Sequence, residues 1–150
     1  MALYYLETSA LVKLYVREPG TDLLLRLTAR RTNHRFAVLS LSRVEMHSAV
    51  RRRQREGGLD GPAADRLLNQ FELHMESRFI KQALSDPVID LATSLVSRNA
   101  LRAYDAVQLA GCLMLKENSA SDEPSFVCSD QRLLQAAENE GLVCLDPGSS

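Results

Sequence analysis

Short apolar runs alternate with longer amphipathic stretches from the first residues of the chain to its end. The apolar runs have strand character and the amphipathic stretches have the helical period of apolar residues. Strands are predicted at 2–6, 35–40, 79–80, 125–128 and 142–145. Helices are predicted after Glu7, from Thr21 to about Arg31, from Ser42 to Arg55, after Pro62, at Asp86, after Asp105 and at Asp130.

This alternation predicts an α/β fold, because parallel strands need a covering connection between them and are buried on both faces. We expect a three-layer α/β/α arrangement with a central parallel sheet. The chain of 150 residues fits one domain, predicted to span 1–146, with a flexible tail at 147–150. No apolar run approaches the ~20 residues of a membrane span, and the N-terminal run lacks the marks of a signal peptide.

Composition narrows the classes of protein that remain. Hydrophobic residues make up 45% of the chain and the formal net charge is -1, which excludes a globally basic nucleic-acid binder but not a local basic patch. Cys112, Cys128 and Cys144 form no CxxC pair, which predicts buried free thiols and a reducing cytoplasm. The three histidines lack the spacing of zinc ligands.

Four acidic residues stand where predicted strands end or helices begin: Glu7, Glu45, Asp105 and Asp130. Each has a purely structural alternative. Ser42 and Glu45 have the spacing of a capping box, and Asp130 is a natural N-cap. Glu7 and Asp105 lie where a helix dipole favours negative charge.

Their shared position favours a functional interpretation. In a parallel sheet, the carboxyl ends of all strands and the following helix N-termini lie at one edge. Two carboxylates about 5 Å apart repel each other by roughly 3 kcal/mol at an effective dielectric near 20. Clusters that contain only acidic oxygen donors suit Mg²⁺ or Mn²⁺, which activate water and stabilise phosphoryl charge. The pattern therefore predicts a metal site formed by these carboxylates.

Four segments resemble, in order and spacing, the motifs of PIN-domain ribonucleases, and VapC-type toxins of toxin–antitoxin pairs are the nearest subgroup. The segments are ETSALVKLYVREPG, SLSRVE, LRAYDAVQLA and FVCSDQRLLQAA. The resemblance implies a cytoplasmic, Mg²⁺- or Mn²⁺-dependent endoribonuclease that acts on RNA, commonly dimeric and inhibited by an antitoxin protein. It also implies that Glu7, Glu45, Asp105 and Asp130 form the site, with Thr8 or Ser9 at the hydroxyl position that supports the first acid.

The first acid departs from the family pattern, in which aspartate is usual at the position of Glu7. The extra methylene shifts the carboxylate by about 1.5 Å, so a catalytically silent module that binds RNA or an antitoxin is the alternative function. A phosphotransfer or receiver-like domain is a third hypothesis. It is disfavoured because the acids are spread over four motifs.

A basic run follows Glu45 on the same predicted helix: Arg51, Arg52, Arg53 and Arg55. It is either a solvated helix end or a contact surface for the RNA backbone or an antitoxin. Lys13 is expected at the surface. An apolar stripe at Leu67, Leu68, Phe71 and Met75 is expected to be core or a dimer surface. Aromatic residues make up only 5%, which predicts little sequence readout by stacking.

Overall fold

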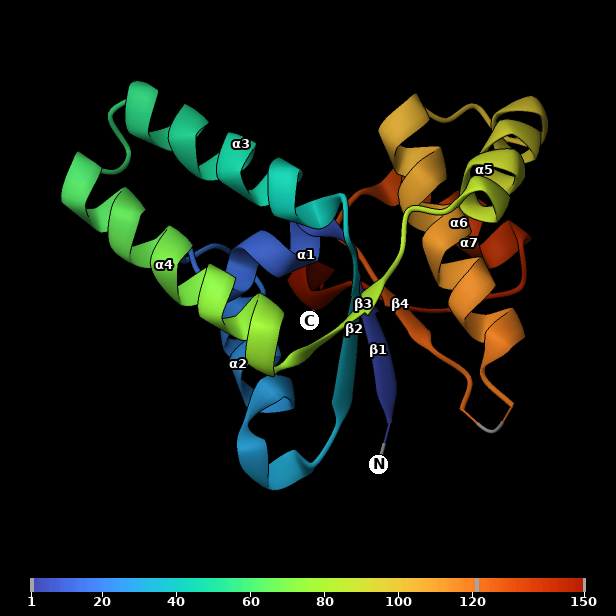
Figure 1. Cartoon of the computed structure of the whole chain (residues 1–150), viewed down its shortest axis with the longest axis horizontal. Coiled ribbons are helices and arrows are strands. Elements are labelled where there is room, and N and C mark those ends of the chain that lie inside the picture. The colour runs from blue at the N-terminus through green and yellow to red at the C-terminus, as the bar shows by residue number, and fades with distance from the viewer. Residues whose placement is uncertain (1, 121, 150) are drawn as a thin grey trace.

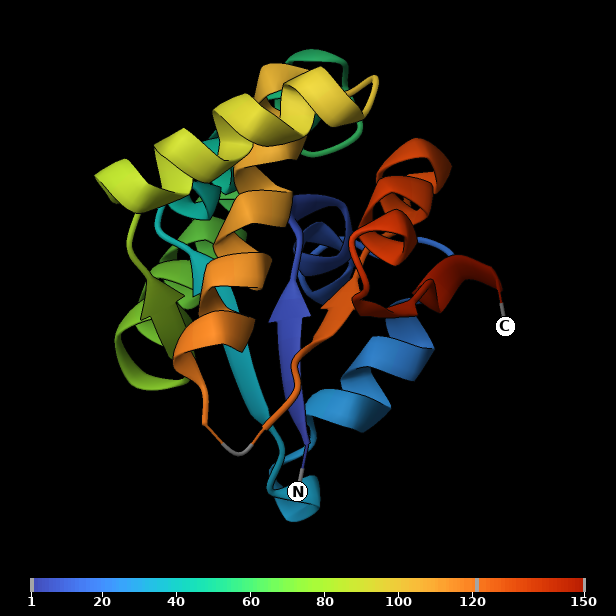
Figure 2. The same ribbon diagram turned by 90° about the vertical axis from the view of Figure 1, so that its right-hand side faces the viewer.

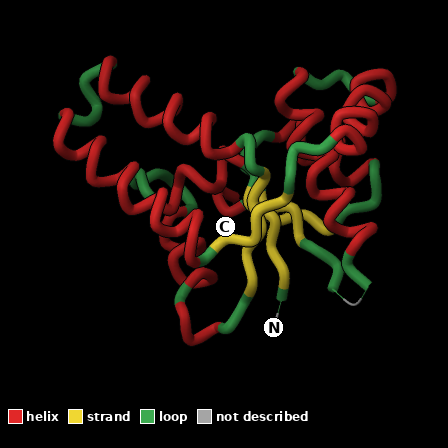
Figure 3. Tube along the Cα trace, viewed as in Figure 1, coloured by secondary structure: helices red, strands yellow, loops and turns green. Residues whose placement is uncertain are grey.

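A computed structural model describes residues 2–120 and 122–149 and contains a five-stranded, wholly parallel sheet with the strand order β3-β2-β1-β4-β5. The strands are β1 (Leu3–Leu6), β2 (Arg35–Leu39), β3 (Phe79–Gln82), β4 (Ser125–Val127) and β5 (Val143–Leu145). Figure 3 shows the strands at the centre of the molecule, with helices on both sides. The predicted three-layer α/β/α fold is confirmed.

Within the described residues, seven α-helices cover the sheet. They are α1 (Thr8–Leu11), α2 (Thr21–Thr28), α3 (Ser42–Arg55), α4 (Gly61–Ser77), α5 (Asp86–Arg98), α6 (Ala103–Asn118) and α7 (Gln131–Asn139). Helices α3 and α4 form a hairpin on one side of the sheet, and α5, α6 and α7 lie on the other (Figures 1 and 2). No helix in the described ranges is long and apolar enough to cross a membrane.

Two apolar cores follow from the alternation of side chains along the buried strands. Leu3 and Tyr5 point into a core shared with α5, α6 and α7. Leu6 points into the opposite core, shared with α1 to α4. The stripe on α4 lies in this second core, where Leu68, Phe71 and Met75 are buried. The core alternative is therefore confirmed for these three residues, whereas Leu67 is half-buried.

Helix α6 packs unusually close to the sheet because Gly111 has no side chain. A Cβ atom at Gly111 would lie 2.6 Å from the Tyr5 hydroxyl and 3.0 Å from Leu39 Cδ1. Contacts this short do not occur between real side chains, so the glycine permits the approach. The approach brings the start of α6 toward the carboxyl end of β1.

Several boundaries differ from the sequence-based expectations. Helix α1 gives way to a 3-10 helix at Val12–Leu14, and α2 ends at Thr28, before a separate 3-10 turn at Arg30–Thr32. The tail expected to be flexible contains a 3-10 turn at Pro147–Ser149 with Pro147 buried. Pro147 packs against Gly20, whose φ of 98° and lack of a Cβ allow the contact. The polar composition of 119–124 also predicts a loop, and residue 121 within it lies outside the described residues.

Candidate active site at the carboxyl edge of the sheet

The site is assembled around the carboxyl end of β1, which lies between β2 and β4 in the sheet. Glu7 directly follows β1, Glu45 lies in the first turn of α3 after β2, and Asp130 follows β4. Asp105 lies in the first turn of α6. The parallel topology therefore brings the four acids to one edge of the sheet, as the sequence predicted.

Glu7 is held by the turn that it caps. Its carboxylate accepts a hydrogen bond of 2.9 Å from the Ser9 backbone amide and another from the Ser9 hydroxyl. The Ser9 hydroxyl in turn accepts a bond of 3.0 Å from the amide of Ser129, beyond β4. Ser9 therefore links the first acid to the neighbouring strand, which agrees with the supporting role expected for it.

Glu45 is held by side chains from two other elements of the fold, α1 and α6. Its Oε1 accepts hydrogen bonds from Thr8 Oγ1 at 3.1 Å and from Gln108 Nε2 at 2.7 Å. The capping-box alternative is wrong, because Glu45 bonds to these groups and the N-cap residue Leu41 has no side-chain cap. Thr8 thus supports the second acid.

The network beneath Glu45 centres on Gln108, which sequence reasoning missed. Gln108 is 1% exposed, and its amide nitrogen also lies 2.9 Å from Ser42 Oγ and 3.1 Å from Thr8 Oγ1. Its amide oxygen accepts a bond of 3.0 Å from the Tyr5 hydroxyl. The signal was present in the sequence, because Gln108 is a polar residue between buried positions on the inward face of α6.

Burial raises the pKa of three of the four acids, Glu7, Glu45 and Asp105. It raises the pKa of Glu7, with the charge of Glu45 adding to the effect. It likewise raises the pKa of Glu45, with a contribution from Asp105, and the pKa of Asp105, with a contribution from Asp130. The four carboxylates are thus electrostatically linked in a series, and each neighbour makes ionisation more costly.

Asp130 also has a structural role. Its carboxylate accepts hydrogen bonds from the amides of Arg132 and Leu133 at 3.0 and 3.2 Å. The N-cap alternative is therefore confirmed for Asp130. Capping occupies one oxygen, Oδ1, and leaves the other for a different ligand.

The donor chemistry of the site fits a hard divalent cation. The hydrogen bonds to Glu7 and Glu45 come from neutral donors, and none of the four acids forms a salt bridge with a described residue. Uncompensated, partly buried carboxylates are stabilised by a bound Mg²⁺ or Mn²⁺. Across residues 2–120 and 122–149, no three His, Cys, Asp or Glu side chains are grouped closely enough to hold a metal as they stand.

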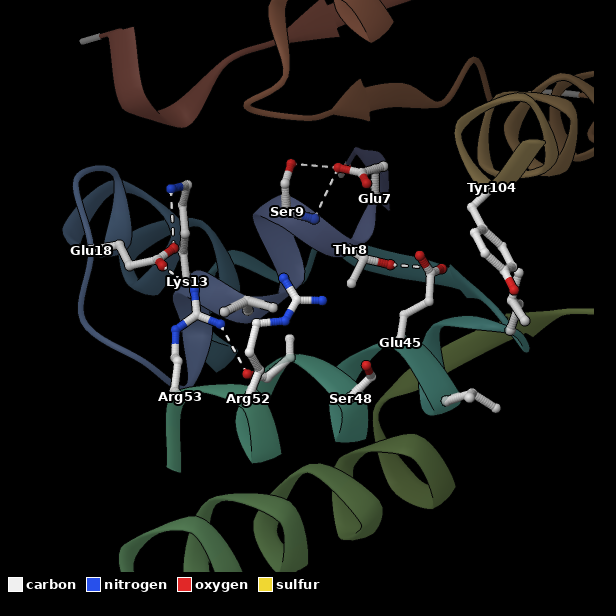
Figure 4. A pocket seen from close by; sticks show the side chains of 14 residues that line it. Glu7, Thr8, Ser9, Lys13, Glu18, Glu45, Ser48, Arg52, Arg53 and Tyr104 are labelled. Atoms are coloured by element: carbon white, nitrogen blue, oxygen red, sulfur yellow. Dashed lines mark hydrogen bonds and ion pairs between the residues drawn. The ribbon is translucent and has the colours of Figure 1, made fainter. Parts of the chain in front are cut away.

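A cavity of about 570 Å³ opens beside the acids. Glu7 and Glu45 line it, whereas Asp105 and Asp130 do not. Figure 4 shows the two glutamates near the middle of this cavity, with Thr8 between them and Ser9 beside Glu7. Two members of the predicted set therefore line the cavity. Of the other two, Asp105 acts electrostatically on Glu45, and Asp130 acts on Asp105.

The basic run on α3 is divided between structural and free residues. Arg51 pairs with Asp65 at 2.9 Å, and Arg53 pairs with Glu18 at 2.6 Å. Arg52 and Arg55 are exposed and have no polar partner among the described residues. Lys13, expected at the surface, is instead buried and pairs with Glu18 at 3.3 Å. Only part of the run is therefore available to a ligand.

The cysteines have no catalytic arrangement. All three are free thiols, with Cys112 and Cys128 buried and Cys144 half-buried. Burial raises the pKa of the Cys128 thiol far above physiological pH, so it remains protonated. The prediction of buried free thiols is confirmed for two of the three.

The raised pKa of Glu45 predicts that this carboxylate destabilises the metal-free fold at neutral pH. The folded state then binds protons more tightly than the unfolded state, whose glutamate pKa is about 4.3. Glu45→Gln should therefore increase the free energy of unfolding at pH 7, and the gain should disappear below about pH 4. Urea unfolding in EDTA across this pH range measures the difference.

Glu72→Gln is the matched control, because the hydrogen bond from Arg43 lowers the pKa of Glu72. This variant should lose stability as pH rises above about 4, the opposite sign. A Glu45→Gln protein that is less stable than the wild type at pH 7 would contradict the assignment of Glu45 as an uncompensated acid.

Known proteins are similar to this chain over nearly its whole length. Ribonuclease VapC35 of Mycobacterium tuberculosis is 33% identical, with 97% of this chain and 98% of the relative covered. Ribonuclease VapC47 of the same organism is also 33% identical, with 97% of each chain covered. No family model matches the chain.

Solved structures share the fold. VapBC2 from Rickettsia felis, bound to a DNA fragment from its promoter, superposes with a TM-score of 0.65 at 13% identity. The match covers 95% of this chain and 97% of that structure's chain. The fold agrees with the resemblance seen in the four motifs, and the identity to the two M. tuberculosis ribonucleases extends that agreement to the whole sequence. The chain therefore belongs to the VapC ribonuclease family.

Proposed function

We propose that this chain is an endoribonuclease that uses Mg²⁺ or Mn²⁺ to hydrolyse RNA phosphodiesters, and that it is the toxin of a toxin–antitoxin pair. The observation that carries the proposal is the set of acids without ion pairs at the carboxyl edge of the sheet, two of which line a cavity. Relatives that are named ribonucleases support the nuclease activity.

In this proposal Glu7, Glu45, Asp105 and Asp130 hold the metal. Once bound, the metal supplies Lewis-acid stabilisation of phosphoryl charge and promotes ionisation of a water molecule. The protein's contribution is orientation. Ser9 restrains the carboxylate of Glu7, and Thr8 and Gln108 restrain that of Glu45. The remaining oxygens of these acids are the ones available for coordination.

The partners follow from the same family membership. A VapBC complex among the structural neighbours supports a VapB-like antitoxin as the protein partner of this chain. The cavity beside the acids is the place where such a partner would have to exclude RNA. We propose a homodimer acting in the cytoplasm, in line with the resemblance of the four motifs to VapC-type toxins.

Two observations favour the alternative of a silent RNA-binding or antitoxin-binding module. Glu7 replaces the aspartate that is usual in the family pattern, and no three candidate ligands within the described ranges form a complete metal site. Two-metal chemistry tolerates displacements of only about 0.5 Å. The length of the side chain at position 7 therefore distinguishes the two functions.

The experiment is cleavage of a fluorescent single-stranded RNA across a Mg²⁺ and Mn²⁺ titration, with the wild type beside Glu7→Asp. We expect metal-dependent cleavage by the wild type. Glu7→Asp should still cap α1, because aspartate is a favoured N-cap residue. Cleavage by Glu7→Asp alone would mean that the natural protein is a weakened member. Absence of cleavage by both, together with no Mn²⁺ uptake in calorimetry, would favour the silent module.

A further inference from the structure

Aromatic, acidic and basic side chains line the cavity beside the acids in that order from one end to the other. Figure 4 shows Tyr104 at one end, Glu45 and Glu7 in the middle, and Arg52 toward the other end. Beyond Arg52 lie Lys13, Glu18 and Arg53. The cavity is therefore acidic at its centre, basic at one end and aromatic at the other.

The floor of the cavity is one face of α3. Its lining residues on this helix include Glu45, Ser48, Ala49, Arg52 and Arg53, which are spaced at i, i+3, i+4, i+7 and i+8. Seven residues of helix separate the second acid from the first arginine, or about 10 Å along the axis. An extended ligand lying along α3 can thus contact both.

Arg52 is a cation on this face that has no ion-pair or hydrogen-bond partner among the described residues. The neighbouring Arg53 is held by Glu18 at 2.6 Å and by the carbonyl of Ala49 at 3.2 Å. The side chain of Arg52 points toward Ser9 in Figure 4, and no described residue provides it with an acceptor. Its five donors are therefore free for an anionic ligand.

The wall behind Arg52 adds positive charge. Buried Lys13 and half-buried Arg53 share the single carboxylate of Glu18, at 3.3 and 2.6 Å. Two cations on one anion leave this triad with a net charge of +1. Together with Arg52, it makes this end of the cavity favourable for a phosphate.

Tyr104 presents an aromatic face at the opposite end. It is 65% exposed, it lines the cavity, and it directly precedes Asp105 in the first turn of α6. Exposed aromatic rings next to a phosphate-binding surface are stacking platforms for bases in single-stranded nucleic acids. In a duplex, the faces of the bases are already stacked on each other.

We infer that Tyr104 and Arg52 are two substrate contacts of this cavity: an unpaired base of the RNA stacks on Tyr104, and a backbone phosphate farther along the same strand is bound by Arg52. The inference rests on the proposed nuclease function and names two side chains that contact its substrate. Because every base has an aromatic face, stacking on Tyr104 predicts recognition of single strands with little sequence preference.

Binding is measured by fluorescence anisotropy of a labelled, mixed-sequence single-stranded RNA, with Asp105→Asn in every protein so that cleavage is slowed by roughly a hundredfold or more. Arg52→Gln should weaken binding and reduce the slope of log K against log salt by about 0.7, the value for one phosphate contact on a single strand. Arg52→Lys should restore most of the slope. Arg55→Gln is the matched control, because Arg55 is on the same helix but does not line the cavity.

Tyr104→Ala should weaken binding by roughly 5- to 100-fold, the loss of one stacked base. Tyr104→Phe should bind like the parent, since it keeps the ring. A duplex RNA of the same sequence should bind more weakly, and Tyr104→Ala should not change that affinity.

Unchanged binding of single-stranded RNA by Arg52→Gln or by Tyr104→Ala would overturn the inference. It would also fail if Arg55→Gln reduced the salt slope as much as Arg52→Gln, or if Arg52→Gln impaired only capture of an acidic antitoxin segment. Failure of the proposed function is separate, because it appears as absence of cleavage by the wild type, whereas this assay measures only the binding of RNA by Asp105→Asn proteins.

Discussion

Replacing Asp105 by asparagine should reduce RNA cleavage by roughly a hundredfold or more, the usual loss when one preorganised electrostatic group is removed. Asp105 contributes negative charge to the series of acids at the edge of the sheet. The amide keeps the volume but loses the charge that a divalent cation requires. Steady-state cleavage of a fluorescent single-stranded RNA at saturating Mn²⁺ measures the effect.

The fold should not suffer from this substitution. Asparagine relieves the repulsion between Asp105 and Asp130, so the melting temperature in EDTA should be equal to or above that of the wild type. Mn²⁺ should raise the melting temperature of the wild type by mass action but should have little effect on the variant.

Asp86→Asn is the control for Asp105→Asn, because Asp86 also lies in the first turn of a helix, α5, and does not line the cavity. It should cleave RNA at the wild-type rate. Wild-type cleavage by Asp105→Asn would remove this residue from the site, and loss of activity in both variants would point to an effect of helix starts in general.

Replacing Gln108 by leucine should lower the free energy of unfolding by about 2–4 kcal/mol, because several buried polar groups lose their partner at once. Glu45 and Ser42 would lose their shared donor, and the Tyr5 hydroxyl would lose its acceptor. Cleavage should fall up to about a hundredfold, since displacement of a reacting group by about 1 Å has effects of that size. Urea unfolding and cleavage assays measure the two losses.

A second core substitution separates positioning from stability. Leu95→Ala removes a fully buried side chain from α5 and should cost a similar 2–5 kcal/mol. Below its unfolding transition it should keep the wild-type kcat, whereas Gln108→Leu should not. Tyr5→Phe removes only the hydroxyl that supports Gln108 and should have an intermediate effect. Equal kcat values for Gln108→Leu and Leu95→Ala would mean that Gln108 contributes to stability and does not position the acids.

Part of the site could be predicted from residues that are close together in the sequence. Glu7 follows an apolar strand and precedes two hydroxyl residues, which is enough to predict an acid at the carboxyl end of a strand. Asp130 follows another strand and caps the next helix, as its position predicted. These features depend on residues close together in the sequence, so propensity and periodicity suffice to find them.

Neighbouring residues did not decide between the structural and the functional role of Glu45. Ser42 and Glu45 have the spacing of a capping box, yet Glu45 bonds to Thr8 and Gln108 instead. The capping geometry offers one weak bond at a helix start, while the fold offers Glu45 two buried donors from other elements. Tertiary contacts therefore overrode the local pattern.

The sequence by itself determined the alternation of strands and helices, the parallel three-layer fold and the placement of four acids at one edge. Only the tertiary structure decided which polar groups meet there. Gln108 lies 100 residues from Thr8, and Arg53 lies 35 residues from Glu18. No local propensity encodes such pairs. They exist because the parallel sheet brings β1, α3 and α6 together, and burial then makes every unpaired polar group costly.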